Sequence, residues 1–105
     1  MNRLSTHVLD TSSGKPANGV PVYLYQGDRE INAGVTDSDG RCQNLLPDGQ
    51  TLSAGVYCIV FDVTALFPGG LYPEVAVSFK VSAEAMHYHI PLLISPFGYT
   101  TYRGS

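Results

Sequence analysis

Short β-patterned runs, separated by glycine and proline, are the sequence feature that most constrains how this chain folds. Eleven glycines and seven prolines are spread along it, and the runs between them are enriched in Val, Ile, Tyr, Phe and Thr. Such residues favour strands, and closely spaced turns between them are typical of an all-β sandwich or barrel. We predict eight strands, over residues 5–11, 20–26, 31–36, 41–45, 56–62, 74–81, 87–94 and 99–103.

The length and composition indicate one folded domain. At 105 residues the chain is shorter than the roughly 150 residues that serve as a prior for one domain, so we expect a single domain over residues 1–105. Hydrophobic residues make up 44% and charged residues 14%, a balance that buries a core and differs from that of disordered chains.

Charge and hydropathy exclude several classes of partner. The net charge is −3, from 6 basic and 9 acidic residues, and there is no basic run, so we expect no nucleic-acid partner. No apolar stretch approaches a membrane span, and the amino terminus lacks the apolar region of a secretory signal, so we expect a soluble, cytoplasmic chain without membrane contact.

Cys42 and Cys58 show no metal or redox spacing, and we expect both to be reduced and in or near the core.

Two segments show how the strands are buried. Apolar and polar residues alternate over 75–81, which predicts a strand with one face on a core. The run 56–61 is almost continuously apolar, which indicates a central strand whose second face is covered by another element or another subunit. A short helix is expected over 62–67, with Asp62 as its N-cap and the following Pro-Gly-Gly as its end.

Three histidines are candidate chemical groups. His7 shares a strand face with Ser5 and Leu9, and a lone strand histidine is more often structural than catalytic. His87 and His89 share a face through their His-x-His spacing, because alternate strand residues point the same way. Two imidazoles on one face can bind zinc, but no third ligand has a local spacing that points to them, so we expect no metal site.

An arginine and the end of the chain are further candidates. Arg41 follows the turn of residues 37–40, where an ion pair with either aspartate of that turn explains it without any function. The sequence ends directly after a β-patterned segment, whereas most domains end in a frayed polar stub. If this tail is ordered, Tyr102, Arg103 and the terminal carboxylate of Ser105 place a hydroxyl, a cation and an anion near that strand.

Four motifs together resemble a known family. They are STHVLD and SGKPA at the front, TDSDGR in the first half and HYHIPLLISPFGYTTYRGS at the end. In this order they resemble the 5-hydroxyisourate hydrolase family of transthyretin-related enzymes. The resemblance implies a transthyretin-like sandwich of two four-stranded sheets with one short helix. It also implies a homotetramer, built as a dimer of dimers, with active sites in the channel between dimers and with no cofactor.

The resemblance also assigns residues and a reaction. The family's catalytic residues match His7, Arg41 and His89, and its substrate-binding residues match His7, Arg41, Tyr102 and Ser105. The implied reaction is the hydrolysis of 5-hydroxyisourate to 2-oxo-4-hydroxy-4-carboxy-5-ureidoimidazoline, on the route from urate to allantoin.

Roles for these residues follow from the chemistry of their side chains. We expect His7 and His89 to converge across the channel as a water-activating and proton-relaying pair, and Arg41 to hold and polarise the anionic substrate. On strand 87–94, we expect His89, Pro91 and Leu93 to face the channel, and Tyr88, Ile90 and Leu92 to face the core. Two other hypotheses are a non-catalytic carrier of an aromatic anion on the same fold, and an adhesion module, which predicts a secretion signal.

Overall fold

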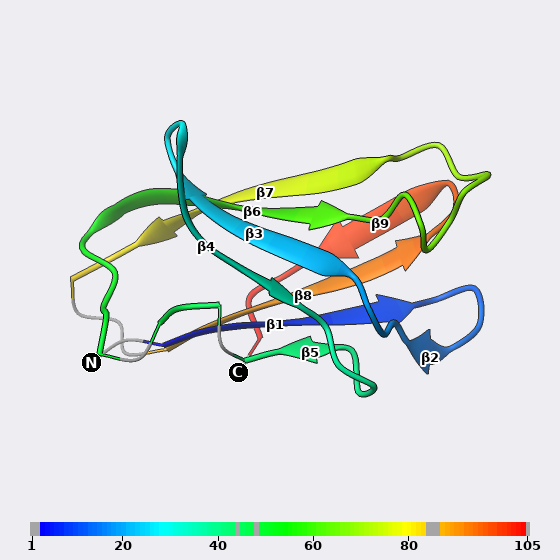
Figure 1. Ribbon diagram of the computed structural model, residues 1–105, viewed down its shortest axis with the longest axis horizontal. Coiled ribbons are helices and arrows are strands. Elements are labelled where there is room, and N and C mark those ends of the chain that lie inside the picture. The colour runs from blue at the N-terminus through cyan, green and yellow to red at the C-terminus, as the bar shows by residue number, and fades with distance from the viewer. Residues whose placement is uncertain (1–2, 44, 48, 84–86, 105) are drawn as a thin grey trace.

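Two β-sheets packed face to face make up the part of the chain that the structure describes, residues 3–43, 45–47, 49–83 and 87–104 (Figure 1). In this computed structural model the described residues form nine strands. They are β1 Arg3–Asp10, β2 Lys15–Pro16, β3 Pro21–Gln26, β4 Arg29–Val35, β5 Arg41–Cys42, β6 Gly55–Asp62, β7 Glu74–Val81, β8 His87–Ser95 and β9 Gly98–Thr101.

The order of the strands puts β1 and β8 in the middle of one sheet. That sheet has the order β2-β1-β8-β9, with β5 also paired with β1, and the other has the order β4-β3-β6-β7. β1 and β8 run parallel, whereas their other neighbours pair antiparallel. Residues from the two ends of the sequence therefore lie side by side on β1 and β8.

The sheets contain five and four strands rather than the predicted four and four. The additional strand is β2, formed by Lys15 and Pro16, which lie between the predicted strands 5–11 and 20–26. β5 is also shorter than the predicted strand 41–45. The carbonyl of buried Leu45 accepts a hydrogen bond from the Asn32 side chain of β4 at 2.8 Å, and this contact draws the chain from β1 toward the other sheet.

The expected helix over 62–67 is only a single turn. The described residues contain no helix, and hence no helix that could span a membrane. The Phe67 N–H donates to the Val63 carbonyl at 3.1 Å, and Asp62 accepts from the Thr64 N–H at 3.1 Å, as a cap would. Pro68 then stops the turn, and one turn alone is too short to be a stable helix.

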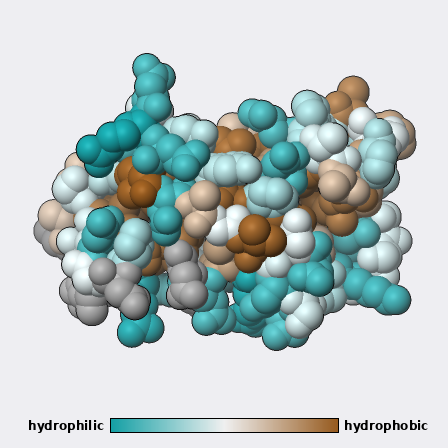
Figure 2. Space-filling view, in the orientation of Figure 1, coloured by the Kyte–Doolittle hydropathy of each residue, from teal (hydrophilic) through white to brown (hydrophobic). Residues whose placement is uncertain are grey.

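Exposed apolar side chains gather at one end of the sandwich. There the β6–β7 loop meets the β8–β9 turn, and the Leu71 N–H donates to the Pro96 carbonyl at 2.8 Å. Leu71 is 63% exposed and Phe97 is 73% exposed. Figure 2 shows hydrophobic surface at this end, at the upper right of the view.

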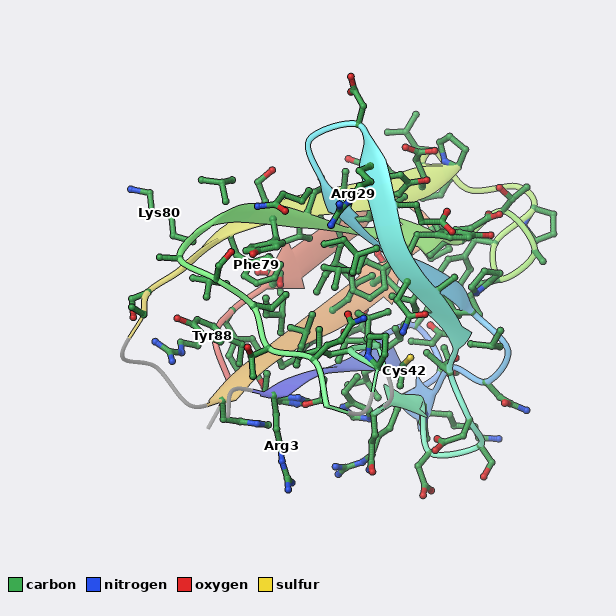
Figure 3. All side chains as sticks on the ribbon, turned by 60° about the vertical axis from the view of Figure 1, so that its left-hand side comes forward. Arg3, Arg29, Cys42, Phe79, Lys80 and Tyr88 are labelled. Carbon is green, nitrogen blue, oxygen red and sulfur yellow. The ribbon has the colours of Figure 1, made fainter. Side chains whose placement is uncertain are left out.

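Alternating side chains fill the space between the sheets. On β7, Val75 and Val81 are buried while Lys80 is exposed, which confirms the predicted alternation. Phe79 and Tyr88 face each other from the two sheets with ring centroids 6.2 Å apart, and Lys80 points outward (Figure 3). The core thus fixes which face of each strand remains on the outside.

β6 is the central strand that its apolar run predicted, because it lies between β3 and β7. Tyr57 and Phe61 are buried against the core, but Val56 on the opposite face is 56% exposed. Within the described part of the chain no element covers Val56, so cover by another subunit stays a prediction. Cys42 is a buried core residue, as expected, whereas Cys58 is half-buried on the outer face of β6 beside Val56; both are thiols.

Candidate active site

The outer face of β1 presents His7. Leu4, Thr6 and Val8 point into the sandwich and are buried, so the intervening residues Ser5 and His7 lie on the outer face, half-buried. The register of β1 against β8 pairs Ser5 with His89 and His7 with Pro91.

His89 lies on the same outer face as His7. Tyr88, Ile90 and Leu92 are buried in the core, as predicted, which leaves His89 on the outside of the neighbouring strand. Pro91, which we expected to face the channel beside His89, is buried. Because paired residues on adjacent strands share a face, the two imidazoles lie diagonally across β1 and β8 within one chain. The structure thus brings both imidazoles to one face of one chain, and their convergence across a channel stays a prediction.

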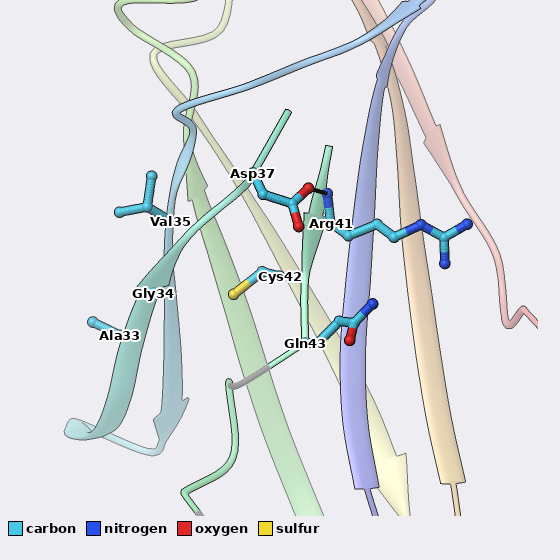
Figure 4. Close-up of a pocket in the computed structure, with 7 residues that line it drawn as sticks. All are labelled: Ala33, Gly34, Val35, Asp37, Arg41, Cys42 and Gln43. Carbon is cyan, nitrogen blue, oxygen red and sulfur yellow. Dashed lines mark hydrogen bonds between the residues drawn. The ribbon is translucent and has the colours of Figure 1, made fainter. Parts of the chain in front are cut away.

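Arg41 joins this face through β5, where it is the register partner of His7. The turn before it is closed by a hydrogen bond from the Gly40 N–H to the Asp37 carbonyl at 2.9 Å. The Asp37 carboxylate accepts from the backbone N–H of Arg41 at 3.0 Å, while the guanidinium extends away across β1 (Figure 4). The aspartate thus stabilises the turn through the backbone and leaves the cationic group directed toward the histidines.

Gly40 is required where β5 begins. Its φ is +75°, a left-handed conformation that glycine adopts readily, and its carbonyl accepts from the Val8 N–H at 2.8 Å. A Cβ at this position would overlap the Val8 carbonyl oxygen. The close approach of Gly40 to β1 therefore fixes Arg41 beside His7.

The side chain of His89 is held on several sides. The Ser5 hydroxyl lies 2.8 Å from Nδ1, and the ring of His87 stacks at 6.4 Å between centroids with an interplanar angle of 13°. Burial lowers the pKa of His89, and electrostatic repulsion from the neighbouring His87, His7 and Arg41 lowers it further. Both effects favour the neutral imidazole, which is the form that can accept a proton.

The tail is ordered as far as the structure describes it. Thr101 donates to the Pro91 carbonyl at 2.7 Å, and the Gly104 N–H donates to the His89 carbonyl at 2.7 Å. Arg103 donates to the His87 carbonyl at 3.3 Å, and its guanidinium lies 4.7 Å from the centre of the Tyr88 ring. The tail therefore follows β8 past the histidines and is held there by backbone and cation–π contacts.

Two predicted substrate-binding residues end this tail. Tyr102 is 57% exposed, so its hydroxyl is available to a ligand. Ser105 lies outside the described residues. Among the described residues, no group of three or more His, Cys, Asp or Glu side chains comes together to hold a metal ion, so His87 and His89 find no third ligand there.

Sequence reasoning missed the contacts that surround His89. Ser5 was identified only as a neighbour of His7, and Gly104 was not singled out. The i, i+2 spacing of Ser5 and His7 placed both on one strand face. The pairing of Ser5 with His89, which lies 84 positions away, leaves no local pattern in the sequence. A Cβ at Gly104 would overlap the His89 ring, so glycine is needed there.

An open groove lies between β4 and β5, beside this face. Its volume is about 400 Å³, and Val35, Asp37 and Gln43 are among the residues that line it (Figure 4). The groove includes neither His7 nor His89, and the Arg41 side chain leaves it toward β1. The imidazoles and the guanidinium together, rather than the groove, make up the candidate site.

The β-sandwich and its outer-face site are found in a known family of proteins. The HIUase/Transthyretin family model matches residues 4–104, so the chain belongs to that family. The 5-hydroxyisourate hydrolase of Mesorhizobium japonicum is 44% identical over 115 residues, which cover 98% of this chain and 92% of that protein. The motif resemblance to this group is confirmed.

Solved structures of two kinds share the fold. The structure of Klebsiella pneumoniae 5-hydroxyisourate hydrolase has a TM-score of 0.89 at 36% identity, and the match covers 100% of both chains. Sea bream transthyretin in complex with thyroxine has a TM-score of 0.88 at 33% identity, covering 97% of this chain and 94% of that one. Because one fold serves both kinds, the function has to be argued from the site.

Proposed function

We propose that this protein hydrolyses 5-hydroxyisourate, opening its six-membered ring to give 2-oxo-4-hydroxy-4-carboxy-5-ureidoimidazoline on the route from urate to allantoin. Water attacks a ring carbonyl in this reaction. The site must therefore take a proton from water near neutral pH and stabilise the negative charge that develops on the carbonyl oxygen. We expect neither a metal nor a cofactor to take part.

The observation that carries the proposal is the gathering of two imidazoles and a guanidinium on the outer face of β1, β5 and β8. His7 is the register partner of Arg41, and His89 lies on β8 two residues before Pro91, which is the partner of His7 there. Imidazole is the side chain best suited to proton transfer near neutral pH, and guanidinium matches the edge of a planar anion. The names of the relatives agree with this chemistry.

Each residue then has a distinct role. His7 and His89 activate the water and relay its proton, and Arg41 binds the anionic substrate and polarises the carbonyl. Tyr102 and Ser105 complete the pocket and orient the substrate.

A non-catalytic carrier of an aromatic anion is the second candidate, because sea bream transthyretin binds thyroxine on the same fold. A carrier needs cationic and apolar groups in its site but has no use for a neutral imidazole. The lowered pKa of His89 favours the hydrolase, since a proton acceptor works only when unprotonated.

The proposal includes an assembly, in which four copies of the single domain 1–105 form a dimer of dimers with the β1–β8 faces lining a channel. β7 and β9 end their sheets, and an edge strand is a template for pairing with another copy. Exposed Leu71, Phe97 and Tyr99 offer apolar surface nearby. We place this assembly in the cytoplasm, where the thiols of Cys42 and Cys58 stay reduced.

The test is a direct assay. Urate oxidase generates 5-hydroxyisourate from urate, and the decay of its ultraviolet absorbance is followed with and without the purified protein. We expect catalytic amounts of protein to accelerate the decay equally with and without a chelator. Unchanged decay at catalytic concentrations, with binding of the anion at stoichiometric ones, would favour the carrier. Loss of activity on chelation and its return with zinc would instead indicate a metal site at His87 and His89.

A further inference from the structure

Ser5 is the residue that contacts His89 at Nδ1. The two residues are register partners on parallel strands, and the Ser5 hydroxyl oxygen lies 2.8 Å from Nδ1. Ser5 is half-buried at the centre of the sheet, so its hydroxyl is held in place by the packing of β1 against β8. This contact occupies one of the two nitrogens of the ring and leaves Nε2 for water or substrate.

The opposite edge of the ring is also fixed. The backbone of Gly104 packs so closely on His89 that a Cβ there would overlap Cδ2, and the Gly104 N–H donates to the His89 carbonyl at 2.7 Å. Together with the stacked ring of His87, these contacts restrict the orientation of the His89 imidazole. The ring is therefore held in one orientation before substrate arrives.

The contact with Ser5 determines which ring nitrogen can act on water. The serine hydroxyl occupies Nδ1, where it can accept a hydrogen bond from an N–H. A neutral imidazole carries one ring proton, so a base that takes a proton from water at Nε2 has its own proton on Nδ1. The Ser5 hydroxyl, at 2.8 Å, is the partner of that N–H.

We propose that Ser5 is a positioning residue that holds His89 with its proton on Nδ1, so that Nε2 presents its lone pair to the attacking water. This inference rests on the proposed function and assigns the general base to His89 rather than His7. Nε2 takes a proton from water as the water oxygen bonds to the ring carbonyl carbon. The carbon–nitrogen bond then breaks, and the leaving nitrogen receives the proton from Nε2.

Substitution of Ser5 tests the positioning role. Because Ser5 touches His89 and not the substrate, we expect Ser5→Ala to lower kcat about 10- to 100-fold with KM nearly unchanged. Ser5→Thr, which keeps the hydroxyl, should restore most of kcat. Ser78→Ala removes an exposed hydroxyl from the other sheet and is the matched control, with parental kinetics expected. Circular dichroism and sedimentation check the fold and assembly of each variant.

The tautomer is measured separately by ¹⁵N NMR of histidine-labelled protein at pH 7.5, with His89→Gln used to assign the signal. We expect Nδ1 of His89 to carry the proton in the parent and the two tautomers to mix in Ser5→Ala. A parent with the proton on Nε2, or a Ser5→Ala variant with parental kcat, would overturn the inference while the hydrolase activity stands. A parent that does not hydrolyse 5-hydroxyisourate fails the proposed function instead, and the NMR result still decides the tautomer.

Discussion

At the scale of single residues, His89 stands among basic side chains from three strands. Burial is the largest cause of its lowered pKa, followed by the charges of His87, His7 and Arg41. A general base works only when it is unprotonated, so activity is lost as the pH falls through its pKa. We therefore expect the acidic limb of kcat/KM to have its midpoint below 6.5, the ordinary pKa of histidine. A midpoint at or above 6.5 would contradict a general base with a lowered pKa.

His87 offers a way to shift that limb without removing a proposed catalytic residue. The His87→Gln variant removes a positive neighbour, so the pKa of His89 rises and the acidic midpoint moves to higher pH. The measurement is the pH profile of kcat/KM beside Lys80→Gln, which removes an exposed cation from the other sheet and should leave the midpoint unchanged. A midpoint that stays fixed or moves down in His87→Gln would show that its charge does not act on His89. A loss of turnover as large as in His89→Ala would place His87 in the site.

At the scale of elements, β5 depends on a glycine that no other residue replaces. Gly14 and Gly40 both have a φ of +75°, but a Cβ at Gly14 meets nothing within 4 Å, whereas one at Gly40 overlaps the Val8 carbonyl oxygen. We expect Gly14→Ala to cost about 1 kcal/mol of stability from backbone strain alone, and Gly40→Ala to cost more. Urea unfolding measures both variants, and equal losses would show that the contact with β1 is unimportant. Activity should fall only in Gly40→Ala, because Arg41 moves.

The tail makes a second prediction at this scale. The Gly104→Ala variant pushes a Cβ into the His89 ring, so we expect lower kcat in a protein that still folds. Gly69→Ala is the control, since a Cβ there meets nothing within 4 Å. Parental kcat in Gly104→Ala would mean that the tail gives way without disturbing the histidine.

How far the elements could be predicted depended on the range of the signal. Alternation is local, and it identified the buried faces of β7 and β8 and the outward His89 correctly. The pairing of Ser5 with His89 is set by packing between distant segments and leaves no local trace. β2 and the shortened β5 were not predicted for the same reason, because each is defined by its pairing with β1. The single turn at residues 62–67 showed a capping signal, but the chain before Pro68 is too short to extend it into a helix.

At the scale of the whole molecule, the outer face of the β1–β8 sheet is the surface that the proposed assembly encloses. Leu93 lies half-buried on this face and pairs with Leu9. We expect Leu93→Glu to bring like charges together around the symmetric channel and to weaken association, with activity falling as tetramer is lost. Sedimentation velocity and the decay assay measure the two effects. Gln26→Glu adds the same charge at the exposed end of β3 and should leave both unchanged.

One outcome would contradict the channel specifically. A Leu93→Glu variant that sediments as a folded monomer and retains the parental rate would show that a single chain completes the site. The arrangement of His7, Arg41 and His89 on one face of one chain would then be sufficient for the chemistry.

The central claim is that hydrolysis of 5-hydroxyisourate takes place on this face, and the most direct test is the rate of its absorbance decay with three single variants. At matched concentration, fold and assembly, we expect His7→Ala, Arg41→Ala and His89→Ala each to lower turnover at least about tenfold, since a positioned acid or base contributes roughly 10²- to 10⁴-fold. Parental rates in all three variants would contradict the claim and place the reaction elsewhere on the molecule.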